Sequence, residues 1–193
     1  MSDNDFLGLL FPESFVKRID IKEIMPCTVE ANGIKFFAQA DKTLNEVLLV
    51  LYLVIPNAKF SEKIGALTYK NQERIVTIFS SGRISMTHVK DRQLAEKLVE
   101  KLRILINRSY IYLKTHGPPE PSLAESKRNL NAMKLYEKLP RTDCKECGEQ
   151  SCFGFAARLF LGEKLPQDCP QLTTVQKAET KNQLDRMLAP IKL

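Results

Sequence analysis

The chain has 193 residues, of which 44% are hydrophobic and 27% charged, and this globular balance excludes collagen-like and largely disordered proteins. The net charge of +6 is spread evenly: residues 1–120 hold 17 Lys and Arg against 14 Asp and Glu, and residues 121–193 hold 12 against 9. Charge alone is therefore weak evidence for a nucleic-acid partner. The longest apolar run, residues 47–55, is too short to span a membrane, and residues 1–10 carry acids where a secretory signal carries bases. We expect a soluble, cytoplasmic protein without a membrane partner.

The first part of the chain alternates between strand and helix patterns. Residues 33–40 alternate apolar and polar side chains, which predicts a strand. Residues 42–55 have apolar side chains at helical spacing, and Pro56 ends the helix. Three further strands at residues 65–70, 74–80 and 83–89, with a turn at Ser81-Gly82, precede a long amphipathic helix that starts at Asp91.

Three prolines and a glycine between residues 115 and 121 predict a linker at 115–122, because these residues interrupt helices and central strands. Helices are expected at residues 122–139, 153–161 and 171–189. The predicted class is thus α+β. An N-terminal domain (1–114), an antiparallel sheet with two helices, is joined to a small all-α domain (123–193).

Four of the five cysteines lie in the C-terminal part with the spacing Cys-x2-Cys-x4-Cys-x16-Cys-Pro. An odd count in a cytosolic chain argues against a disulfide framework. Three thiolates in one loop and a distant fourth can surround one [4Fe-4S] cluster. Zinc usually takes two Cys-x2-Cys pairs, and only one is present, so zinc stays an alternative, as do two disulfides. The predicted ligands are Cys144, Cys147, Cys152 and Cys169.

Other features of this segment favour a cluster. Gly148 gives the loop freedom to wrap, and a helix that starts at Ser151 or Cys152 would point its N–H groups at an anionic group. Pro170 fixes the turn after the last cysteine. Cys27, beside Pro26, is interpreted as an idle or buried thiol.

Residues 139–159 (LPRTDCKECGEQSCFGFAARL) and 168–170 (DCP) resemble the iron–sulfur domain of two families. These are the large subunit of the corrinoid iron–sulfur protein and the B subunit of Rnf-type electron-transport complexes. The resemblance covers residues 130–172. It implies a low-potential [4Fe-4S] cluster that passes single electrons, with the four cysteines as ligands and Phe155 and Ala156 packed behind them. The electron partner is not implied.

Residues 34–108 resemble one repeat of the TATA-binding protein, on the stretches 56–60 (PNAKF), 67–70 (LTYK) and 78–83 (IFSSGR). That family uses two repeats as a saddle on the DNA minor groove, so one repeat implies a homodimer. Its wedging phenylalanines correspond to Phe79 and Ile64. Its groove-reading asparagine falls on Lys35 and a groove-floor valine on Ser85. The predicted face for DNA or a protein partner comprises Lys35, Ile64, Phe79, Arg83, Ser85 and Thr87.

The sequence offers no Ser-His-Asp set, phosphate-binding glycine loop or paired carboxylates, and His88 and His116 are its only histidines. We therefore expect a non-catalytic protein. The favoured hypothesis is a [4Fe-4S] electron-transfer module for a protein partner, and the alternative is a redox-sensitive regulator that binds duplex DNA.

Overall fold

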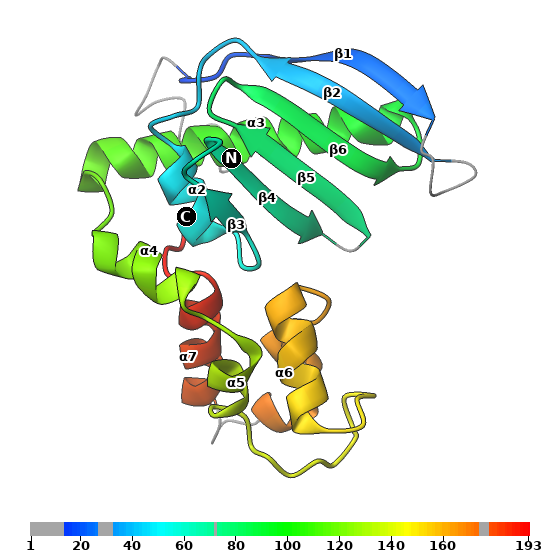
Figure 1. The fold of residues 1–193 in the computed structure, drawn as a ribbon, viewed down its shortest axis with the longest axis vertical. Helices are drawn as coiled ribbons and strands as arrows, with labels where there is room; N and C mark the ends of the chain where they lie inside the picture. Colours follow the sequence, from blue (N-terminus) through cyan, green and yellow to red (C-terminus); the bar gives the residue numbers. More distant parts are fainter. Residues whose placement is uncertain (1–13, 27–32, 72, 174–177) are drawn as a thin grey trace, which may run out of the picture.

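The structure is a computed structural model that describes residues 14–26, 33–71, 73–173 and 178–193. Residues 1–10, Cys27 and part of the predicted final helix lie outside this part of the chain. Two lobes stand one above the other in Figure 1. We call residues 14–128 the sheet lobe and residues 129–188 the helical lobe.

The sheet lobe contains one six-stranded antiparallel sheet with the order β1-β2-β6-β5-β4-β3 (Figure 1). Strands β2, β4, β5 and β6 correspond to the four predicted from alternation. The edge strands β1 and β3 were not predicted. In β1, apolar and charged residues alternate only in part, and β3 has three residues, too few to show a period of two. The strands are β1 (Ile19–Pro26), β2 (Ile34–Ala40), β3 (Lys59–Ser61), β4 (Ala66–Asn71), β5 (Arg74–Phe79) and β6 (Arg83–Val89).

One face of the sheet is apolar and is covered by two helices, α2 (Leu48–Val54) and α3 (Arg92–His116). Side chains such as Phe36, Ile78 and Ile84, at most 1% exposed, form this core, as the alternation predicted. Helix α2 starts later than expected, because Leu44 first pairs with the β5–β6 turn through a 2.7 Å bond from its N–H to the carbonyl of Ser80.

Helix α3 begins as predicted, with the Asp91 carboxylate accepting the N–H of Leu94 at 2.7 Å. The prediction of a single helix at residues 122–139 is wrong. The structure has α4 (Pro121–Arg128) and α5 (Ala132–Tyr136). The side chain of Asn131 accepts the N–H of Lys134 at 3.0 Å and so starts a new helix. Helix α4 packs on α2, whereas α5 packs on α6.

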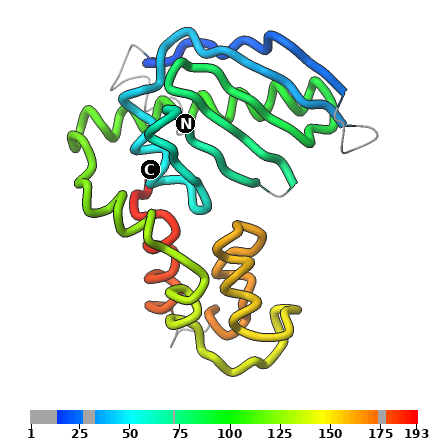
Figure 2. The backbone as a smooth tube through the Cα atoms, viewed as in Figure 1, coloured from blue at the N-terminus to red at the C-terminus, as the bar shows by residue number. Residues whose placement is uncertain are grey.

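The helical lobe consists of α5, α6 (Cys152–Leu161), two 3-10 turns (Pro166–Asp168 and Pro170–Leu172) and α7 (Ala178–Leu188). It has a hydrophobic core of its own, with Leu135, Phe155 and Leu159 at its centre. After α7 the chain returns to the sheet lobe (Figure 2). There Ile191 is 4% exposed within the first core and its N–H lies 3.4 Å from the carbonyl oxygen of Leu53.

The α+β class is thus confirmed, while the identity with a TATA-binding-protein repeat and the boundary at 115–122 stay predictions. Helix α3 runs two residues into the predicted linker, and α4, which starts within the linker at Pro121, shares the core of the sheet lobe through Ala124. Within the described residues, no helix has the length and apolar character needed to cross a membrane.

Candidate metal centre

All four predicted cysteines line one cavity in the helical lobe. Cys144 and Cys147 lie in the loop between α5 and α6, Cys152 is the first residue of α6, and Cys169 lies between the two 3-10 turns. Their exposure is graded: Cys144 is exposed, Cys147 and Cys152 are half-buried and Cys169 is buried. The sequence order of the thiols therefore runs from the surface to the core of the lobe.

The loop that carries the first two thiols follows an unusual backbone path. Arg141, Asp143 and Lys145 have φ values of 57°, 47° and 64°, and Gly148 has φ 82°. Left-handed conformations cost free energy in residues other than glycine, and such residues cluster at binding sites where other contacts hold them. The left-handed residues therefore mark this loop as a candidate binding site.

Two side chains hold the loop against the start of α6. The Asp143 carboxylate accepts the backbone N–H of Cys152 at 2.6 Å, and the Ser151 hydroxyl caps α6 by accepting the N–H of Gly154 at 3.1 Å. Sequence reasoning anticipated the helix start at Ser151 but missed Asp143. The sequence does carry a signal for this role of Asp143. An aspartate directly before a cysteine has a short side chain, and aspartates often accept hydrogen bonds from nearby backbone N–H groups.

The electrostatics of Cys169 reflect its burial among the other thiols. Burial raises the pKa of the Cys169 thiol, and the neighbouring Cys147 and Cys144 raise it further, because a second thiolate would be a like charge. The backbone N–H groups of Leu172 and Gln171 act in the opposite direction. A buried thiol with like neighbours needs a cation to ionise, which is what a metal centre supplies.

The arrangement of the thiols differs from that of a site for a single ion. Tetrahedral zinc–thiolate bonds of about 2.3 Å place the sulfurs about 3.8 Å apart, and among the described residues no three Cys, His, Asp or Glu side chains are arranged to hold one metal ion. A cube of iron and sulfide keeps its thiolates farther apart. The cavity that the thiols line has a volume of about 10 Å3. The turn of the loop at Gly148 has open space around it.

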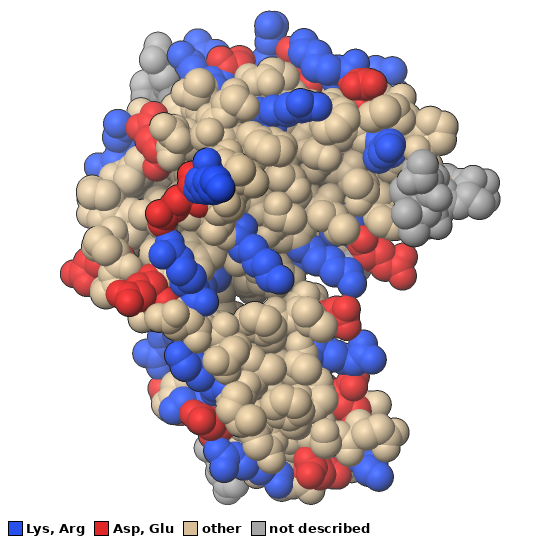
Figure 3. Space-filling view, in the orientation of Figure 1, with Lys and Arg blue, Asp and Glu red and all other residues tan. Residues whose placement is uncertain are grey.

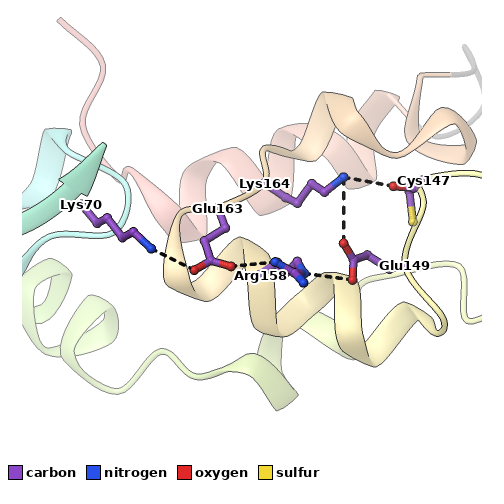
Figure 4. A network of polar contacts seen from close by, with 6 residues as sticks. All are labelled: Lys70, Cys147, Glu149, Arg158, Glu163 and Lys164. Atoms are coloured by element: carbon purple, nitrogen blue, oxygen red, sulfur yellow. Dashed lines mark hydrogen bonds and ion pairs between the residues drawn. The ribbon is translucent and has the colours of Figure 1, made fainter. Parts of the chain in front are cut away.

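A chain of polar contacts connects this loop to the sheet lobe (Figure 4). The Lys164 ammonium donates to the carbonyl of Cys147 at 3.1 Å and lies 3.9 Å from Glu149. Arg158 then forms ion pairs with Glu149 at 3.0 Å and with Glu163 at 2.9 Å. Lys70 of β4 pairs with Glu163 at 3.1 Å and completes the connection. The hydrogen bond from Lys70 is the largest cause of the lowered pKa of Glu163.

The residues predicted for a DNA or partner face fall into two groups. Five lie on the face of the sheet that α2 and α3 leave open. Ile64, 65% exposed, lies instead in the turn between β3 and β4. The Arg83 guanidinium stacks on the ring of Phe37 at 4.2 Å. The five on the open face are Lys35, Phe79, Arg83, Ser85 and Thr87.

Comparison with protein families matches a segment of the helical lobe. Residues 139–171 match a protein family described as "Putative Fe-S cluster". This segment is similar to an iron–sulfur cluster domain. The match supports an iron–sulfur cofactor and agrees with the thiol-lined cavity.

The relatives are gamma subunits of the acetyl-CoA decarbonylase/synthase complex. That of Methanocaldococcus jannaschii is 35% identical over 63 residues, 33% of this chain and 13% of the relative. Gamma 1 of Methanosarcina thermophila is 42% identical over 59 residues, 30% of this chain and 13% of the relative. That of Methanothermobacter thermautotrophicus is 39% identical over 61 residues, 32% of this chain and 12% of the relative. The chain thus matches about an eighth of each relative's length. No solved structure matches it significantly.

Proposed function

We propose that Cys144, Cys147, Cys152 and Cys169 hold one [4Fe-4S] cluster and that the protein is a non-catalytic electron-transfer module for a protein partner. The observation that carries the proposal is the convergence of four thiols on one cavity within the segment similar to an iron–sulfur domain. A [4Fe-4S] centre supplies a one-electron couple.

The chain's own residues would set the properties of that couple. Phe155 and Leu139, 1% and 5% exposed, line the inner side of the cavity and keep water away from Cys169. The N-terminus of α6 and the Lys164 ammonium place positive charge near the thiolates. Burial and hydrogen bonding of the sulfurs are the usual determinants of cluster potential.

The exposed Cys144 gives the site one open side, where a partner could approach closely. A protein partner is plausible because the relatives are named as subunits of a complex.

The proposal predicts a brown protein after anaerobic purification, with about four iron and four sulfide per chain and an EPR signal on reduction. Serine in place of each of the four cysteines should abolish or strongly reduce the iron content. Cys27→Ser is the matched control and should keep its iron. Zinc in place of iron, or equal iron loss in Cys27→Ser, would refute the ligand assignment. A reduction potential well above about −200 mV would refute a low-potential donor.

A further inference from the structure

A second cavity, of about 210 Å3, lies at the boundary of the two lobes, away from the cysteines. One wall belongs to the sheet lobe, with Tyr52 and residues 56–60, and the other to the helical lobe, with Leu130, Phe160 and Leu188. Figure 3 shows Lys and Arg side chains along the sheet-lobe side of this boundary.

The charged residues that line the cavity all have the same sign. They are Lys59, Lys127 and Arg128, and no Asp or Glu is among the lining residues. Arg128 also pairs with Glu62, 2.5 Å away and outside the lining. The rest of the lining is mostly apolar or aromatic, so the cavity combines a positive rim with an apolar interior.

Lys127 is the deepest of these cations, with 7% of the residue exposed. Its ammonium donates to the carbonyls of Tyr52 and Ile55, both at 2.6 Å, at the C-terminal end of α2. It also lies 5.1 Å from the centre of the Tyr52 ring. An ammonium has three N–H groups, and these carbonyls take two. No described carboxylate forms an ion pair with it.

A buried ammonium without a counter-ion is costly. Burial lowers the pKa of Lys127 to about 7. In the absence of a ligand, a large fraction of the Lys127 side chains is therefore uncharged near pH 7. An anion in the cavity would accept a hydrogen bond from the third N–H of the ammonium and would supply the negative charge that the ammonium lacks.

We propose that this cavity binds a small organic carboxylate, with the carboxylate on Lys127 and the apolar body between Phe60 and Phe160. A carboxylate suits a single ammonium, and the aromatic walls suit a flat apolar group. The volume is sufficient, since an apolar cavity of about 150 Å3 binds benzene. Because its walls come from both lobes, the ligand bridges the sheet lobe and the lobe with the cysteines.

The test uses the cluster-loaded protein and benzoate as the probe, with calorimetric titration at pH 8 in two buffers of different ionisation enthalpy. Benzoate should bind and take up close to one proton, because burial lowers the pKa of Lys127 to about 7 and a bound carboxylate favours the charged ammonium. The charged and titratable groups near Lys127 are Lys59, Arg128, Glu62 and Tyr52. Leu130, which precedes α5, Phe160 of α6 and Leu188 of α7 add no charge. Benzamide, the neutral analogue, should bind at least tenfold more weakly.

Lys127→Met should weaken benzoate binding at least tenfold, and Lys59→Gln should weaken it less. Lys63→Gln, in the turn that follows β3 and outside the cavity, is the control and should bind as the parent does. If Lys127→Met does not fold, the proton uptake of the unaltered protein decides. Absence of benzoate binding, equal affinity for benzamide, or binding without proton uptake would overturn the proposal.

Discussion

The contact between Gly162 and Asn57 allows a sharp test of how the two lobes are joined. Gly162 ends α6 with φ 72°, and a Cβ added there would overlap the Nδ2 and Cγ atoms of Asn57. The same Nδ2 donates to the carbonyl of Lys70 at 2.7 Å. Gly162→Ala therefore strains the backbone of one lobe and displaces a side chain of the other.

The expected loss of stability is about 2–3 kcal/mol. A left-handed alanine costs about 1 kcal/mol more than glycine, and loss of the Asn57 bond to Lys70 costs about 1 kcal/mol. Residual overlap adds a little more. This would be a large part of the stability of a typical domain, about 5–15 kcal/mol.

A double-mutant cycle separates the terms. In the Asn57→Ala background, Gly162→Ala should cost only the backbone term of about 1 kcal/mol. Because the chain has no tryptophan, urea unfolding is followed by far-ultraviolet circular dichroism. An equal cost of Gly162→Ala in the parent and in the Asn57→Ala background would refute the reasoning.

Three further predictions concern charge and metal. Between about pH 7.5 and 9.5 stability should rise with pH by up to about 1.4 kcal/mol per unit, because the pKa of Lys127 is lowered to about 7 by burial and the unfolded chain binds the extra proton. Urea titrations of Lys127→Met should lose this slope, and an unchanged slope would contradict the burial of the ammonium. Asp143→Ala should lose iron to a chelator several-fold faster than the parent. Asp143→Asn keeps an acceptor for the N–H of Cys152 and should lose iron at nearly the parent rate. Equal rates for the two variants would show that the hydrogen bond from Cys152 is unimportant for holding the metal. Removal of the metal should reduce helical dichroism and leave the sheet signal, since small metal domains depend on their metal for folding, and parallel loss of both signals would argue against separate cores.

The sheet lobe was largely predictable because its signals are local. Alternation in β2, β5 and β6 put Phe36, Ile78 and Ile84 on one face, and that face is the core. The edge strand β3 could not be predicted, because pairing with β4 defines it and its own three residues do not.

In the helical lobe, cysteine spacing predicted which thiols share a cavity, because loop ligands must lie near one another. The break before α5 was predictable in principle, since Asn131 is a good capping residue, but the apolar pattern of residues 122–139 concealed it. Lys127 could not be anticipated. In sequence it is one more lysine on an amphipathic helix, and its burial arises only when α4 packs on the end of α2.

The return of the chain to the sheet lobe at Ile191 has a mechanical consequence. The segment that carries the thiols leaves the sheet lobe after α4 and rejoins it after α7, so it is anchored at both ends. A lobe that is joined to its neighbour by one segment can rotate about that segment, whereas a lobe joined by two segments keeps its orientation. A protein that docks on the open sheet would therefore meet the thiol-bearing loop at a constant separation and orientation.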